Sequence, residues 1–213
     1  MKNIYCISGL GADERIFKHL HVPQATFIHL PWLPFDEHET MQTYAAKMAA
    51  QINEQEPILI GLSFGGMLVS EISQQIPIRK GFLISSAKNK NELPDLSAII
   101  TFLLQHGLVP FNLFKIPNRV LFEKFGATTD DEKKLLSDIL KDTQSDYLRA
   151  AFKVILQWNS TSMPQHSIHI HGTHDRIIDP TYVHPNYWIQ DGSHMMIWNR
   201  SKEIADIITD HIY

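Results

Sequence analysis

Cysteine is nearly absent from this sequence of 213 residues, which contains Cys6 alone. One thiol cannot form an intrachain disulfide, so a disulfide-stabilised secreted scaffold is excluded and a reducing compartment is favoured. The sequence also lacks any run of about 18 apolar residues, so we expect no transmembrane helix. Glycines and charges interrupt the apolar start of the chain before it can form a signal-peptide core. We therefore expect a cytoplasmic protein.

An excess of charge of one sign is also missing. The sequence has 19 Lys and Arg against 23 Asp and Glu, a formal net charge of −4, and it has no basic run. Nucleic acids and anionic membranes attract basic surfaces, so neither is an expected partner. With 44% hydrophobic and 20% charged residues, the composition is that of an ordinary globular domain. The length suits one domain with a modest insertion.

Short apolar runs bounded by glycine, proline or asparagine alternate with segments of helical periodicity. This alternation is typical of βα units that build a parallel sheet covered on both faces. We expect strands at residues 3–8, 26–30, 58–62, 81–85, 167–171 and 187–190, and helices at 41–54, directly after 63 and at 201–212. The predicted fold is of the α/β class, with a mostly parallel sheet of about six strands flanked by helices.

The segment from residue 88 to 163 differs because it contains helical patterns but no convincing strand. We expect helices at residues 96–108, 111–125, 130–140 and 145–158. Residues 1–87 and 164–213 are therefore predicted to form a core, and residues 88–163 an all-helical cap inserted between two core strands. An insertion after a strand end of an open parallel sheet lies over the crevice where ligands bind in such folds.

The strongest local motif is GLSFG at residues 61–65, which places Ser63 in a G-x-S-x-G pattern. It follows an apolar strand pattern and precedes a helical one, which is the strand, turn and helix that a nucleophile elbow requires. A turn sharp enough to lift the serine above the sheet leaves no room for a Cβ on either side, so the glycines fit this interpretation. The bland alternative is an ordinary serine in a glycine-rich turn.

Two downstream loops supply the base and the acid that an activated serine needs. His194 lies in a glycine-containing loop after the last predicted strand, and Asp175 follows the strand before it. Asp179 is a second acidic candidate, but it directly precedes Pro180 in what looks like a turn. Asp191 is interpreted as a turn former whose side chain caps local backbone. We therefore prefer Asp175 as the acid.

The sequence thus carries three motifs in order: GLSFG at residues 61–65, GTHDRIIDP at 172–180 and GSH at 192–194. Together they resemble the α/β-hydrolase superfamily, in which serine, acid and histidine follow one another in this order. The resemblance implies that Ser63 is the nucleophile, His194 the general base and Asp175 the orienting acid. It also implies that residues 88–163 correspond to the variable cap of that superfamily.

The same resemblance assigns an oxyanion hole to two backbone N–H groups. The stretch from Ser8 to Gly11 matches the loop after the first strand, so Leu10 is one expected donor, and Phe64, directly after the nucleophile, is the other. Ser8 stands where many members have histidine, but backbone donors need not depend on that side chain. Neither a metal nor an organic cofactor is expected.

The implied reaction is cleavage of an ester-like bond, a carboxylester, thioester or lactone, through an acyl-enzyme on Ser63. The expected partner is a small, largely apolar molecule, because a minority of the large apolar residues of the predicted cap should face the nucleophile. The large apolar residues from which this minority would come are Phe102, Leu103, Phe111, Phe114, Phe122, Phe125, Phe152 and Trp158.

Two other interpretations stay open. His169, His171 and His174 resemble part of the zinc motif of metallo-β-lactamase-like hydrolases, although Thr173 occupies the place of its aspartate. We prefer the interpretation that the two strand histidines are satisfied by neighbours or solvent. A triad-bearing fold can also serve as a ligand receptor with little turnover. Covalent labelling without product release would indicate a receptor, and chelator-sensitive activity without labelling would indicate zinc.

Overall fold

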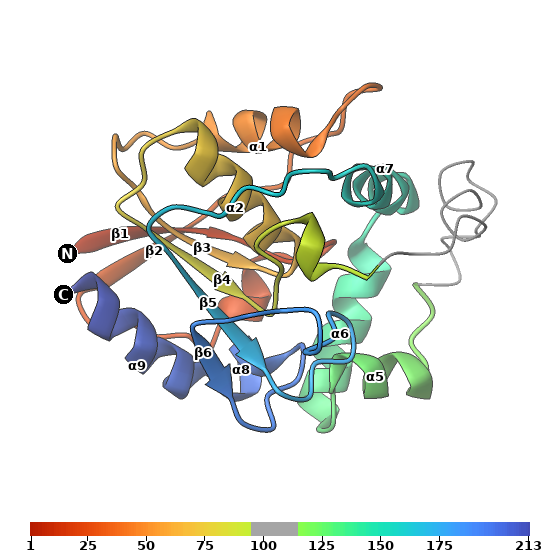
Figure 1. Ribbon diagram of the computed structural model, residues 1–213. Coiled ribbons are helices and arrows are strands. Elements are labelled where there is room, and N and C mark those ends of the chain that lie inside the picture. Colours follow the sequence, from red (N-terminus) through yellow and green to blue (C-terminus); the bar gives the residue numbers. More distant parts are fainter. Residues whose placement is uncertain (95–114) are drawn as a thin grey trace.

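Six parallel strands form one sheet in the order β2-β1-β3-β4-β5-β6 (Figure 1). The computed structural model describes residues 1–94 and 115–213. The strands are β1 (Lys2–Ile7), β2 (Ala25–His29), β3 (Ile58–Leu62), β4 (Lys80–Ile84), β5 (Ser167–Gly172) and β6 (Tyr187–Ile189). All six predicted strands are confirmed, and no predicted end differs from the observed one by more than one residue.

Alternate residues of each central strand enter hydrophobic clusters on opposite faces of the sheet. In β1, Ile4 and Cys6 belong to one cluster, whereas Tyr5 and Ile7 belong to the other. Such strands must be apolar on both sides, which explains their nearly continuous hydrophobic sequence. Burial raises the pKa of the Cys6 thiol far above its usual range, so this cysteine is a protonated core residue.

Helices cover both faces of the sheet. Helices α1 (Met41–Ala49) and α2 (Phe64–Gln75) lie on one face, and α8 (Met196–Asn199) and α9 (Ser201–Ile212) lie on the other (Figure 1). The predicted end of α1 at residue 54 is wrong, because the chain leaves the α-helical pattern earlier. The N–H groups of Gln51 and Ile52 bond carbonyls three residues back, which tightens the last turn and ends the helix.

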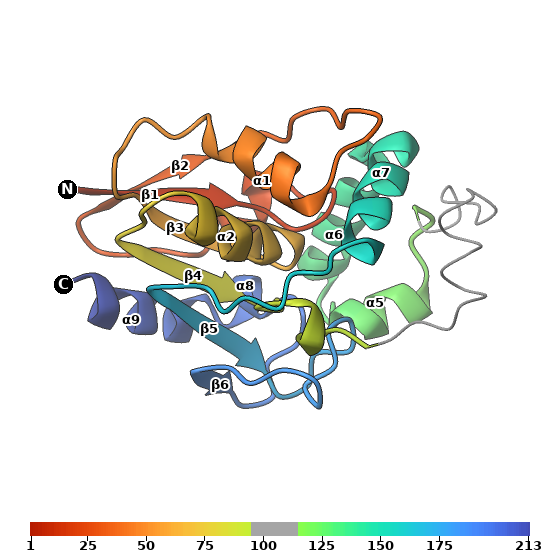
Figure 2. The same cartoon turned by 45° about the horizontal axis from the view of Figure 1, so that its top comes forward.

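Among the described residues between β4 and β5, all regular secondary structure is helical and none is strand. They include the short 3₁₀ turn η2 (Lys90–Glu92) and the helices α5 (Arg119–Phe125), α6 (Asp130–Asp142) and α7 (Ser145–Leu156). These three helices lie beyond the carboxyl ends of the strands (Figure 2). The predicted helix at 96–108 and the first residues of the one at 111–125 lie outside the described residues.

The inserted helices share the hydrophobic clusters of the sheet. Leu136 of α6 belongs to the cluster that contains α9, and Val154 of α7 belongs to the cluster that contains α1 and α2. The described part of the insertion therefore packs onto both sides of the core. The division into core and cap domains stays a prediction. Among the described residues, no helix combines the length and apolar character needed to span a membrane.

Backbone segments pack tightly where α2 begins against the end of β1. A Cβ at Gly65 would lie 2.3 Å from the carbonyl oxygen of Ile7 and 2.4 Å from that of Ser8. Both obstacles are backbone atoms of adjoining structure, so neither can rotate away.

Gly65→Ala should therefore destabilise the fold by about 3 kcal/mol or more, since overpacking at a site that cannot relax is costly. Gly9→Ala is the matched control, because a Cβ at Gly9 would make only ordinary contacts, the nearest at 3.5 Å. Urea unfolding of both variants measures the difference. Equal stability of the two variants would contradict this account of the packing.

Candidate active site

Ser63 sits at the end of β3 in a strained backbone conformation. Its φ of 53° and ψ of −118° lie outside the regions that non-glycine residues favour. Hydrogen bonds hold both sides of the residue: its N–H donates to Ile84 O at 2.9 Å, and its carbonyl accepts from Ser86 Oγ at 2.6 Å. A Cβ at Gly61 would lie 2.3 Å from Gly65 O, so the turn is as tight as the motif predicts.

His194 connects the serine to a carboxylate. Its Nε2 lies 3.1 Å from Ser63 Oγ, and its Nδ1 lies 2.8 Å from Asp175 Oδ2. A carboxylate only accepts, so Nδ1 donates to Asp175 and Nε2 is left to accept the serine proton. The histidine is buried, whereas Ser63 is partly exposed.

Asp175 is buried and fully engaged by hydrogen bonds. Its Oδ1 accepts from the N–H groups of Ile177 and Ile178 at 2.8 and 2.9 Å. Burial alone would raise its pKa, but the neighbouring His194 and His171 and the hydrogen bonds from His194 and Ile178 together outweigh burial, so the pKa is lowered and the group is a carboxylate. Asp179 is exposed and its Oδ1 accepts from the N–H of Thr181 at 2.9 Å, so it stabilises the following turn instead.

The loops that carry Asp175 and His194 touch each other through backbone atoms. A Cβ at Gly172 would lie 2.1 Å from Gly192 O, and the N–H of His174 donates to the same oxygen at 2.9 Å. Glycine at residue 172 allows this approach. The contact fixes the separation between Asp175 and His194.

His171 contacts the turn that follows Asp175. Its Nε2 lies 3.0 Å from Ile178 O and 3.7 Å from Asp175 Oδ2, and its ring meets that of His169 edge to face at 5.3 Å. Both rings are almost completely buried, so solvent does not reach either. Ile178 satisfies one nitrogen of His171, but neither ring nitrogen of His169 has a hydrogen-bond partner among the described residues, so the interpretation that neighbours or solvent satisfy both rings is wrong for His169. Burial lowers the pKa of both histidines, which keeps them neutral.

The three histidines considered as zinc ligands do not converge. His174 is exposed and pairs with Asp191 at 3.3 Å, away from the two buried rings. Within residues 1–94 and 115–213, no group of three or more His, Cys, Asp or Glu side chains could hold a metal ion. The described residues therefore give the zinc interpretation no ligand set.

The turn at residues 9–12 lies against the serine. A Cβ at Gly9 would be 3.5 Å from the Ser63 Cβ, and the N–H of Ala12 donates to Gly9 O at 2.9 Å. That bond closes the turn without using the N–H of Leu10. Ser8 Oγ donates to Ala12 O at 2.6 Å, so the serine found in place of histidine stabilises the turn.

Phe64, the second expected donor, is the first residue of α2. Its N–H belongs to the first helical turn, where backbone donors have no acceptor inside the helix. The Phe64 ring is buried and stacks on Trp32 at a centroid distance of 5.5 Å. The side chain thus anchors the start of the helix while the amide stays at the elbow.

Part of the inserted segment touches the histidine. The Phe125 ring meets His194 edge on at 5.5 Å, and Phe125 O accepts from the N–H of Met195 at 3.2 Å. Trp158, another candidate for the pocket wall, is buried in the core and donates from Nε1 to Glu71 at 2.6 Å. Phe102, Leu103, Phe111 and Phe114 lie outside the described residues.

Sequence reasoning missed the supporting roles of Ser86 and His171. Ser86 forms part of a Ser-Ser pair directly after β4, the neighbour of β3, and that position next to the elbow was the available signal. His171 was considered only as a possible ligand. Its hydrogen bond to Ile178 depends on how the loop folds back, which strand periodicity does not reveal.

No protein-family model matches the chain, and no curated protein matches its sequence significantly. Solved structures do match its fold. A lipase-esterase related protein from Clostridium acetobutylicum ATCC 824 has a TM-score of 0.68 at 16% identity, covering 99% of this chain and 94% of that one. A bromoperoxidase from Bacillus anthracis gives 0.70 at 16%, over 99% and 91%, and an epoxide hydrolase from Bacillus megaterium gives 0.67 at 12%, over 100% and 93%.

At such low identities the likeness is one of fold. The chain has the α/β-hydrolase fold, as the three sequence motifs predicted. The names of these similar proteins describe different reactions, so the chemistry of this chain must be argued from its own site.

The lowered pKa of Asp175 predicts a pH-dependent contribution to stability. A carboxyl group whose pKa is lower in the folded than in the unfolded state stabilises the fold above its unfolded pKa, about 3.9, and this contribution is lost as pH falls through the folded value. The free energy of unfolding of the wild type should therefore exceed that of Asp175→Asn at neutral pH, and the gap should narrow below about pH 4.

Urea unfolding at a series of pH values measures this gap. Asp191→Asn is the control, because Asp191 is exposed and asparagine tolerates its positive φ of 57°. A gap for Asp175→Asn that does not narrow on acidification would contradict the prediction.

Proposed function

We propose that the chain is a serine hydrolase that cleaves a carboxylester, thioester or lactone bond of a small, largely apolar substrate. The observation that carries the proposal is the unbroken series of contacts from Ser63 Oγ to His194 and on to Asp175, at 3.1 and 2.8 Å. A serine favours acyl transfer over epoxide opening, for which related folds use aspartate. The single cysteine supports a reducing, cytoplasmic setting.

In the proposed reaction, Ser63 Oγ attacks the substrate carbonyl while His194 Nε2 accepts the hydroxyl proton. Asp175 keeps the imidazole in the Nδ1–H tautomer and stabilises the imidazolium that forms. His194 then gives the proton to the leaving alcohol, thiol or ring oxygen, which produces an acyl-enzyme. Water, deprotonated by His194, attacks the acyl group, and the proton returns to Ser63 as the acid product leaves.

The N–H groups of Leu10 and Phe64 are proposed to bind the oxyanion of the tetrahedral intermediates. Two observations support this role: the turn at residues 9–12 contacts Ser63, and Phe64 begins a helix whose first amides lack internal acceptors. Donors fixed by the backbone need not reorganise when charge develops on the substrate oxygen.

An apolar substrate is proposed because aromatic groups adjoin the serine and its base. Phe125 contacts His194, and Trp32 packs between Phe64 and Tyr147, with centroid distances of 5.5 and 5.7 Å. Surfaces of this kind bind hydrocarbon and offer little to an ionised acyl chain.

Ser63→Ala and His194→Ala should each abolish covalent labelling by a fluorophosphonate. Turnover of p-nitrophenyl esters should fall by a factor on the order of 10⁴ to 10⁶, because the nucleophile or its base is removed. Intact-mass analysis detects the adduct. Labelling that survives Ser63→Ala would end the assignment of the nucleophile. A wild type that is labelled by the fluorophosphonate but releases little or no product from the p-nitrophenyl esters would favour a ligand receptor.

Asp175→Asn and Asp179→Asn form a matched pair for the acid. The first variant disturbs the imidazole tautomer and should lose most of the activity, whereas the second alters an exposed turn and should stay within about twofold of the wild type. The reverse ranking would transfer the role to Asp179.

Substrate preference is testable with acetate, butyrate, octanoate and hemisuccinate esters of one leaving group. The value of kcat/KM should rise with acyl length by up to about 1 kcal/mol for each buried methylene until the pocket is filled, and the hemisuccinate should be poor. Rates indifferent to chain length, or a preference for the hemisuccinate, would show that the pocket is not lined mainly by hydrocarbon.

A further inference from the structure

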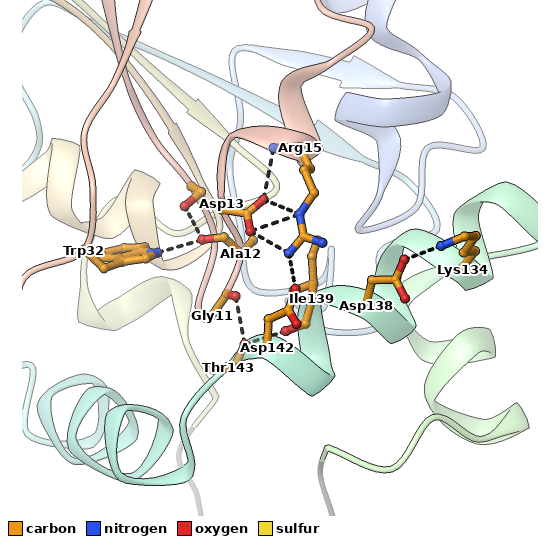
Figure 3. A network of polar contacts seen from close by, with 11 residues as sticks. Gly11, Ala12, Asp13, Arg15, Trp32, Lys134, Asp138, Ile139, Asp142 and Thr143 are labelled. Carbon is orange, nitrogen blue, oxygen red and sulfur yellow. Dashed lines mark hydrogen bonds and ion pairs between the residues drawn. The ribbon is translucent and has the colours of Figure 1, made fainter.

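Side chains from three separate segments hold the turn at residues 9–12. Ala12 O accepts from Ser8 Oγ at 2.6 Å and from Trp32 Nε1 at 2.8 Å. Gly11 O lies 2.8 Å from Thr143 Oγ1. Figure 3 draws this contact between the turn and the end of α6. Thr143 directly follows α6, so the third contact comes from the insertion between β4 and β5.

The Thr143 hydroxyl has two carbonyl acceptors within reach. Ile139 O, at 2.7 Å, also accepts the backbone N–H of Thr143 at 3.1 Å, whereas Gly11 O has no other donor among the described residues. Donation to Gly11 O therefore satisfies both carbonyls, and we assign the hydroxyl proton to it. Thr143 is buried against the turn, and a Cβ at Gly11 would lie 2.6 Å from Thr143 Oγ1. Gly11 has a φ of 72°, which glycine adopts without the steric cost that another residue would meet.

Peptide planarity transmits this hydrogen bond to Leu10. The carbonyl of Gly11 and the N–H of Ala12 belong to one rigid peptide plane, so fixing the first orients the second. The Ala12 N–H donates to Gly9 O at 2.9 Å. The C=O of Gly9 lies in one peptide plane with the N–H of Leu10, so the hydrogen bond links that plane to the plane of Gly11 and Ala12. Because the bond is trans, the Leu10 N–H points away from Ala12, on the opposite side of its plane.

We propose that Thr143 is a positioning residue that fixes the direction of the Leu10 N–H and so completes the oxyanion hole from within the insertion. This inference rests on the proposed function. It makes the insertion part of the catalytic geometry as well as a cover for the substrate.

A neighbouring ion pair contributes less to the same contact. Arg15 Nη2 lies 2.6 Å from Asp13 and 2.7 Å from Asp142, which joins the segment after the turn to the end of α6 (Figure 3). The Asp142 side chain is 64% exposed, and exposed pairs of this kind are screened by water and salt. The buried hydroxyl of Thr143 is therefore the group to test.

Thr143→Val keeps the shape of the side chain and removes its proton, whereas Thr143→Ser keeps the proton. In Thr143→Val, kcat for a p-nitrophenyl ester should fall by about tenfold with KM little changed, because the oxyanion donor matters mainly in the transition state. Affinity for a trifluoromethyl ketone, which forms a tetrahedral oxyanion on the serine, should fall in parallel. Thr143→Ser should restore both toward wild-type values.

Asp138→Asn is the control on the same helix, because Asp138 pairs with Lys134 at 2.6 Å and does not touch the turn (Figure 3). It should leave kcat and ketone affinity unchanged. The proposal is overturned if Thr143→Val retains the wild-type kcat, if its loss appears only in KM, or if Thr143→Ser is as impaired as the valine variant.

Amide hydrogen exchange of residues 8–13 gives a readout that needs no turnover. Exchange should be faster in Thr143→Val than in the wild type and unchanged in Asp138→Asn. Equal exchange in all three proteins would overturn the proposal that Thr143 holds the turn. A wild type that neither reacts with a fluorophosphonate nor cleaves esters would instead refute the proposed function, whatever the exchange shows.

Discussion

Close contact between backbone segments at the carboxyl edge of the sheet is the constraint on which the site depends. At Gly65, α2 meets the last carbonyls of β1, and at Gly172 the loop of the acid meets the loop of the histidine. A side chain at either position would push the segments apart by more than a hydrogen bond tolerates. The distances from Ser63 to His194 and from His194 to Asp175 are therefore set by the backbone, and side-chain rotation has little freedom to alter them.

Hydrogen bonds to backbone groups complete this arrangement and keep a buried charge tolerable. The carboxylate of Asp175 would be costly in an apolar interior, but two amides and the imidazole N–H satisfy its oxygens. His171 adds a neutral donor to the carbonyl of Ile178 in the same turn. The strained φ of Ser63 is likewise held by bonds to the neighbouring strand, including the one from Ser86. Preorganisation of this kind costs stability locally, and the two hydrophobic clusters that sandwich the sheet offset it.

The sequence was sufficient for the strands and for the three residues that meet at the site, because apolar periodicity and glycine-flanked motifs are local signals. Asp175 could be preferred over Asp179 for the same reason, since proline after Asp179 marked a turn. The sequence could not show that α1 ends at Ala49 or that His171 reaches Ile178. Both depend on how a loop folds back in three dimensions. Thr143 carried no motif at all, because its partner lies 132 residues away in the chain.

The insertion has a structural relation to the site that its helical pattern alone did not predict. Its α6 ends against the turn that carries Leu10, and its α5 ends against the loop that carries His194. These two contacts flank Ser63, and hydrophobic side chains of α6 and α7 continue into the two clusters of the core. A cover that only excluded water would need neither set of contacts. Helices anchored on both sides of the serine couple the packing of the insertion to the geometry of His194 and of the turn that carries Leu10, so changes in one should be transmitted to the other.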